Sequence, residues 1–189
     1  MARKPSELPS RGQAQLLADA ADAAARWFRR PEPAALSAAR TARLRSRGAR
    51  EGAVAGLRGR KGAAATGVAD YSFALREAVE HAVAAVSDAT QWGLGADAEF
   101  AAMADGLRAG AKSLARAAAA AGAARADALD DAKRWAADVE RRRRAALDAA
   151  RESPFFVEAV KRSEVAARLS SAAEGLQQAC DALAGSLAE

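Results

Sequence analysis

The chain has 189 residues, enough for one compact domain or two small ones, and carries a formal net charge of +5. It is rich in alanine, the best helix former, and lacks isoleucine and asparagine, so we expect an all-α protein with a thin, alanine-lined core. Its single cysteine excludes an internal disulfide, and no stretch of about 20 apolar residues predicts a membrane span.

The first half of the sequence predicts three helices. The first starts at Ser10, which has capping-box spacing with Gln13, and ends before Pro31. The second covers about 34–57, and a loop over about 59–69 follows. The third is capped by Asp70 or Ser72 and ends at the glycines of 93–95. Apolar residues recur at helical spacing in the first helix (Leu17, Ala20, Ala24 and Phe28) and in the third (Leu75, Val79, Ala82 and Val86). The second helix has only a few large apolar residues: Leu36, Leu44, Val54 and Leu57.

The second half predicts three more helices. Asp97 caps the fourth, Gly122 breaks it, and the fifth runs to Ser153, which caps a sixth helix beginning at Pro154. The sixth has the most regular apolar seam, with alternating steps of four and three residues. The expected apolar stripes are, in the fourth helix, Phe100, Met103, Leu107, Leu114 and Ala118; in the fifth, Leu129, Ala132, Trp135, Val139 and Ala146; and in the sixth, Val165, Leu169, Ala172, Leu176, Ala179, Leu183 and Leu187.

Short connections between these helices favour antiparallel neighbours. We therefore expect residues 1–9 to form a disordered arm and residues 10–189 to form one domain, a six-helix antiparallel bundle of two three-helix layers.

Basic residues concentrate between positions 34 and 61, where Glu51 is the one acid among eight basic side chains. Such an excess favours an acidic partner, whether protein, nucleic acid or anionic lipid. We take Arg40, Arg43, Arg47 and Arg50 as the candidate partner-binding residues.

Other reactive side chains suggest structural roles. His81 is the only histidine, and we expect it at the surface or at the edge of the core. Cys180 lies in the sixth seam and is expected to be a half-buried apolar side chain. The run 141–144 is all arginine and winds around its helix, so we expect it to pair with Asp138, Glu140, Asp148 and Glu152 on a solvated face. No convergent set of titratable groups suggests an enzyme.

Three stretches resemble the PhoU-like family of phosphate-uptake regulators, in particular its short members found with Pit-type phosphate transporters. They are residues 136–147, with an acidic turn before arginine and small apolar residues; residues 160–169 with Cys180 four positions after Leu176; and residues 16–28. The resemblance implies a PhoU-like bundle and a regulatory role without catalysis.

The family's metal-binding repeats pair acids four residues apart, so that both carboxylates share one helix face. Here the fifth-helix pair falls on Arg134 and Asp138, the sixth-helix pair on Ser170 and Glu174, and the second-helix pair on Arg45 and Ala49. Asp138 and Glu174 are thus the remnants of degenerate metal positions. We expect no bound metal and no cofactor.

Together these features predict a non-enzymatic accessory protein of phosphate uptake that docks through the second helix. Its partner would be a Pit-type transporter or a regulatory protein, and self-association would bury more of the apolar surface. A basic protein binding nucleic acid and a phasin-like coating protein are the alternatives. The basic start at 1–5 precedes no apolar segment, so we expect a cytoplasmic protein, at most peripheral at the inner membrane face.

Overall fold

The computed structural model describes residues 10–57, 62–152 and 154–185, and these residues form six α-helices without a strand. The predicted all-α six-helix bundle is therefore confirmed. The expected arm 1–9 lies outside the described residues. The helices are α1 (Ser10–Arg29), α2 (Pro33–Gly56), α3 (Ala63–Gln91), α4 (Ala98–Ala119), α5 (Gly122–Arg151) and α6 (Phe156–Gly185).

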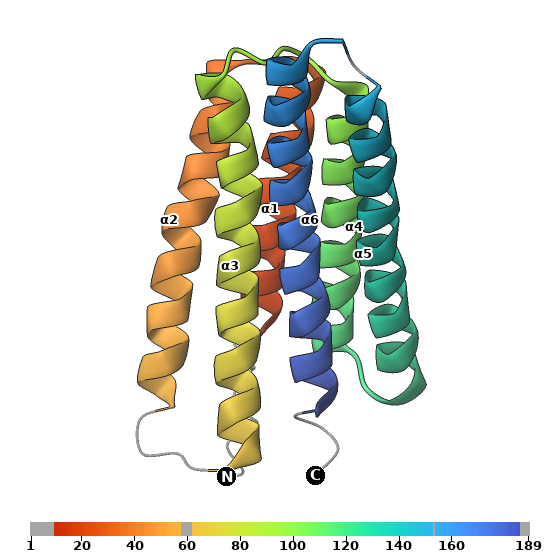
Figure 1. Cartoon of the computed structure of the whole chain (residues 1–189). Coiled ribbons are helices and arrows are strands. Elements are labelled where there is room, and N and C mark those ends of the chain that lie inside the picture. Colours follow the sequence, from red (N-terminus) through yellow and green to blue (C-terminus); the bar gives the residue numbers. More distant parts are fainter. Residues whose placement is uncertain (1–9, 58–61, 153, 186–189) are drawn as a thin grey trace, which may run out of the picture.

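Consecutive helices run in opposite directions along the bundle (Figure 1). Helices α1, α2 and α3 pack on one another, as do α4, α5 and α6, and the two groups join through α1 against α4 and α3 against α6. This packing agrees with two three-helix layers. The α1–α2, α3–α4 and α5–α6 connections all lie at one end of the bundle, drawn uppermost in Figure 1.

The predicted end of α3 and start of α4 are confirmed in atomic detail. Gly93 follows α3 with a φ of +69°, which a glycine adopts without a side-chain clash. Asp97 then caps α4, because its Oδ1 atom accepts hydrogen bonds from the backbone N–H groups of Glu99 (2.9 Å) and Phe100 (3.0 Å). These bonds satisfy two of the donors that a helix start otherwise leaves free.

Two predicted helix starts are wrong in detail. Helix α3 begins at Ala63 rather than at Asp70 or Ser72, so residues 63–69 of the expected 59–69 loop are helical. Residues 59–61 of that loop lie outside the described residues. The alanines after Gly62 favour helix strongly enough to carry it through Gly67. Helix α6 begins at Phe156, two residues after Pro154, and Ser153 lies outside the described residues.

Helix α1 begins at Ser10 as expected, and the expected capping box with Gln13 involves a side chain, that of Ser10, outside the described part of the chain. The Gln13 amide is buried, and neither of its polar atoms forms a hydrogen bond with the residues that the structure describes.

The core follows the predicted stripes of α1, α3, α4 and α6. Phe28 and Phe100 are fully buried, with their ring centroids 5.3 Å apart in an edge-to-face arrangement. The stripe of α5 is only partly buried, since Trp135 is 43% exposed. Leu187 lies outside the described residues.

Helix α2 breaks the rule that large apolar residues mark the buried face. Leu44 is 67% exposed and Val54 is 47% exposed, and Leu36 is partly buried. The buried side of α2 consists of small residues: Ala35, Ala39, Ala42, Ser46 and Ala53. Small side chains allow close approach to α1 and α3 but bury little apolar area, so α2 keeps an exposed apolar and basic outer surface.

Gly175 permits a close approach between α3 and α6. A Cβ atom on Gly175 would lie 2.9 Å from the Ala74 carbonyl oxygen and 3.0 Å from the Ala78 Cβ atom. The two helices therefore pack backbone against side chain at this point, where any larger residue would push them apart.

Candidate functional site: the basic face of helix α2

The four arginines proposed for partner binding lie outside the buried side of α2. Their spacing of three or four positions places them along one flank of the helix, where Arg40 and Arg47 are exposed and Arg43 and Arg50 are half-buried. We call Arg40, Arg43, Arg47 and Arg50 the basic face.

Two members of the basic face share one carboxylate on α3. The Nε atom of Arg43 lies 2.5 Å from one Glu80 carboxylate oxygen, and the Nε atom of Arg47 lies 2.8 Å from the other. Burial acts in the opposite direction, but the hydrogen bonds and charges of Arg47 and Arg43 together lower the pKa of Glu80. One negative charge serves two guanidinium groups, so a positive charge remains at this point.

The other two members are more available. Arg50 stacks its guanidinium group over the Phe73 ring, 5.7 Å from the centroid, and forms no ion pair with a described residue. Arg40 is exposed and forms no ion pair within the residues that the structure describes. The structure thus brings the four predicted residues onto one surface, with two held by Glu80.

Exposed apolar side chains lie among these arginines, and the sequence did not predict them there. Leu44 follows Arg40 by one helical turn, Val54 follows Arg50 by one turn, and Phe73 of α3 is 50% exposed. An alternation of cations with apolar side chains is typical of a protein-binding surface, since solvated surfaces rarely gather large apolar residues. The signal in the sequence was the crowding of small residues on the opposite side of α2.

Of the two remnant acidic positions, Asp138 forms ion pairs with arginine and Glu174 lines a groove. Asp138 pairs with Arg141 (2.6 Å) and with Arg142 (3.1 Å). Glu174 lines a groove between α5 and α6 together with Glu140 and Ser170. Within the described ranges, no three histidine, cysteine, aspartate or glutamate side chains gather as metal ligands do.

The arginine run on α5 pairs with acids as predicted. The Glu140 carboxylate accepts two hydrogen bonds from Arg143, at 2.7 and 2.8 Å, and one each from Arg144 and Ser170. The hydrogen bonds from Arg143 contribute most to lowering the pKa of Glu140, which falls to about 2. Asp148, in contrast, pairs with Arg151.

The two other reactive side chains, Cys180 and His81, lie in the core and at its edge. Cys180 is completely buried rather than half-buried, and burial raises the pKa of its thiol to about 12. A thiol held in its protonated form is a poor nucleophile. His81 is half-buried on α3, as expected for an edge position.

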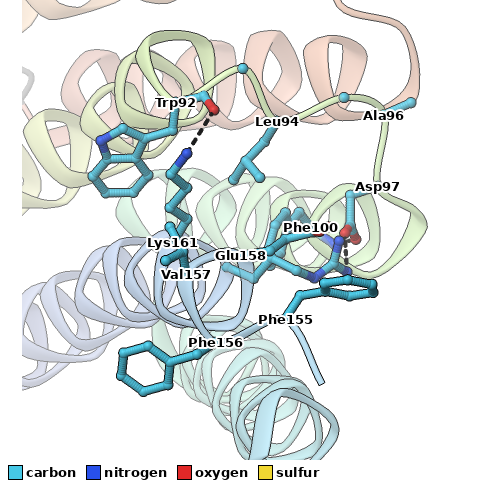
Figure 2. A pocket seen from close by; sticks show the side chains of 13 residues that line it. Trp92, Leu94, Ala96, Asp97, Phe100, Phe155, Phe156, Val157, Glu158 and Lys161 are labelled. Atoms are coloured by element: carbon cyan, nitrogen blue, oxygen red, sulfur yellow. Dashed lines mark hydrogen bonds and ion pairs between the residues drawn. The ribbon is translucent and has the colours of Figure 1, made fainter. Parts of the chain in front are cut away.

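A second surface feature lies at the bundle end that carries the α3–α4 and α5–α6 connections. A cavity of about 650 Å³ opens there, lined by Trp92, Leu94, Phe155, Phe156 and Lys161 among others. Figure 2 shows Lys161 reaching the Trp92 carbonyl oxygen, a hydrogen bond of 3.3 Å. Phe155 and Phe156 are 68% and 78% exposed, which the sequence analysis missed because it placed Pro154 inside the helix.

Comparison of the chain with protein-family models and with curated proteins finds no match. None of the helices built from the described residues is long and apolar enough to cross a membrane.

Proposed function

We propose that this chain is a non-enzymatic docking protein whose basic face binds an acidic protein surface. The observation that carries the proposal is the charge excess on α2, where two of the four arginines, Arg43 and Arg47, share the single carboxylate of Glu80. Opposite charge across such an interface speeds association and selects the partner.

The exposed apolar side chains favour protein over nucleic acid as the partner. A phosphate backbone is bound by cations alone, and single-stranded bases require aromatic stacking surfaces. Among the residues that the structure describes, Phe73 alone brings an aromatic ring against the basic face, and Arg50 lies over that ring. Leu44 and Val54 instead suit an acidic amphipathic helix, which would place apolar side chains on them and carboxylates on the arginines.

The identity of the partner is the part of the proposal that depends on the PhoU-like resemblance. That resemblance, together with the six-helix bundle and the arginine-paired remnant Asp138, supports a regulator of phosphate uptake without metal clusters. Its partner would be the cytoplasmic surface of a Pit-type transporter, and the protein would be cytoplasmic and peripheral at the inner membrane face.

The test is co-purification from detergent-solubilised membranes after nuclease treatment, with bound proteins identified by mass spectrometry. We expect a phosphate transporter that is retained by the wild-type chain, lost with Arg40→Glu/Arg50→Glu, and increasingly released as salt is raised. Neither arginine forms an ion pair within the described part of the chain, so the double variant should keep its fold.

Arg45→Glu is the matched control. Arg45 is an exposed arginine of α2, as Arg40 is, but it lies on the other flank, beside Asp19 and Asp22 of α1. Loss of every partner on nuclease treatment would show that nucleic acid is the ligand, and equal loss with Arg45→Glu would show that α2 does not present a specific face.

A further inference from the structure

We propose that the groove between the start of α1 and the end of α4 is a binding site for a small anion that carries several phosphate groups, such as inorganic triphosphate. The two helices pack on each other, and the groove lies at the end of the bundle opposite the α3–α4 connection (Figure 1). No residue of α2 lines it, so the inference is independent of the proposed function.

Small side chains make this surface concave. Ala115, Ala119 and Ala120, at the end of α4 and just beyond it, line a cavity of about 470 Å³. That volume lies within the usual range for ligand sites. Alanine leaves open the space that longer side chains would fill, so a small ligand can enter between the two helices.

All the charged side chains that line this cavity are cations. Arg11 of α1 and Lys112 of α4 are exposed and form no ion pair with any residue that the structure describes. Arg116 pairs with Asp131 of α5 at 3.3 Å, but the same carboxylate also pairs with Arg134. One acid therefore serves two arginines, and the groove keeps an excess of positive charge that attracts anions.

Backbone dipoles and uncharged groups do not reverse this charge. The positive end of the α1 dipole lies beside the negative end of the α4 dipole, so the two oppose each other. Gln15 lines the cavity and donates a hydrogen bond to Asp19 at 2.9 Å, and Asp19 itself is not part of the lining. The cationic side chains thus decide which ligands the groove attracts.

The excess charge is confined to this end of the seam between α1 and α4. Arg108, closer to the middle of α4, pairs with Asp22 at 2.8 Å and with Asp105 at 3.0 Å. Arg26 and Arg29 of α1 pair with the same two acids. A nucleic acid is bound along a continuous cationic track, and the neutralised middle of the seam interrupts such a track. The site therefore suits a small anion better than a long one.

The lining favours phosphate over other anionic ligands. Among the described residues that form it, none is aromatic and alanine is the largest apolar side chain. Neither a nucleotide base nor the apolar anchors of an acidic peptide would find a complementary surface here. The oxygens of a phosphate group point in several directions, so one group can accept hydrogen bonds from both helices, whereas the two oxygens of a carboxylate lie in one plane.

The test is isothermal titration calorimetry of the full-length chain with sodium triphosphate, in about 0.1 M sodium chloride to screen weak surface association. We expect one ion to bind per chain with a dissociation constant below about 1 mM. Arg11→Gln and Lys112→Gln should each weaken binding by about fivefold, and the double variant should weaken it by more than either. Both side chains are exposed, so circular dichroism should show an unchanged fold.

Arg45→Gln is the matched control. It removes the same charge from an exposed arginine that lies outside the groove, and it should bind triphosphate like wild type. In two-dimensional NMR spectra, the backbone amide signals of Ala119 and Ala120 should shift on titration of the wild-type chain and shift less in Lys112→Gln.

The proposal is overturned if triphosphate does not bind saturably below about 1 mM. It is also overturned if Arg45→Gln weakens binding as much as Lys112→Gln, because the binding would then reflect net charge alone. Citrate binding as tightly as triphosphate would refute the preference for phosphate, and tighter binding of a long deoxythymidine oligonucleotide through the same two cations would show that the ligand is a nucleic acid. None of these outcomes involves Arg40 or Arg50, so they leave the proposal for α2 to its own test.

Discussion

Gly175→Ala tests the close packing of α3 against α6, on which the bundle depends. The added Cβ atom would lie 2.9 Å from the Ala74 carbonyl oxygen, 3.0 Å from the Ala78 Cβ atom and 3.2 Å from the Ala78 backbone nitrogen. These neighbours are backbone atoms and a methyl group, which cannot rotate away. The helices must separate locally, and the packing around Leu176 must follow.

The magnitude follows from two opposing terms. Replacing glycine by alanine inside a helix favours the folded state by about 1 kcal/mol. Overpacking costs about 1–3 kcal/mol, and the upper part of that range applies here because the clash involves backbone. We therefore expect Gly175→Ala to lower the free energy of unfolding by about 1–2 kcal/mol.

Gly48→Ala is the matched control for this substitution. Gly48 also lies inside a helix, but a Cβ atom there would meet nothing within 4 Å. We expect this variant to gain up to about 1 kcal/mol from helix propensity alone. The measurement is guanidinium chloride denaturation of the three proteins, followed by circular dichroism at 222 nm and analysed with a common m value. If Gly175→Ala proves as stable as Gly48→Ala, the described contact between α3 and α6 is not present in solution.

Three further predictions concern the cap, the Glu140 cluster and the buried thiol. Asp97→Ala should lower the free energy of unfolding, measured by urea denaturation, by about 2 kcal/mol, because it removes the α4 cap and the partner of Arg162. Asp97→Ser should recover part of this loss, since serine can also cap a helix. Full stability of the alanine variant would contradict the cap. The pKa of Glu140 is lowered from an ordinary 4.5 to about 2, so its contribution is complete above pH 4.5 and is lost as the pH falls towards 2. After allowance for solvent screening we expect a loss of about 1–2 kcal/mol over this range, absent in Glu140→Gln, and parallel pH profiles for the two proteins would refute it. Cys180, with a pKa raised to about 12 by burial, should react with Ellman's reagent at pH 8 only in denaturant, whereas rapid reaction of the native protein would show that α6 opens.

Local sequence patterns determined the helical class, the number of helices and most of the core. Four helices place large apolar residues such as Phe28, Val79, Leu107 and Leu169 at helical spacing, and all four side chains are buried. Asp97 and Gly93 mark a connection by properties of their own side chains and backbone, which is why the α3–α4 boundary could be predicted. The paired state of arginines 141–144 was predictable for the same reason, because most of their partners lie within one helical turn.

Only the tertiary structure decided which features are available to a ligand. The partner of Arg43 and Arg47 is Glu80 of another helix, and no local pattern links residues so far apart. Leu44 and Val54 have the composition of core residues, yet they face water because α2 needs its small residues for close packing on α1 and α3. Phe155 and Phe156 are exposed because the bundle ends where α6 begins. Periodicity identifies a helix and its two faces, but burial depends on which neighbours are present, and that is a property of the assembled bundle.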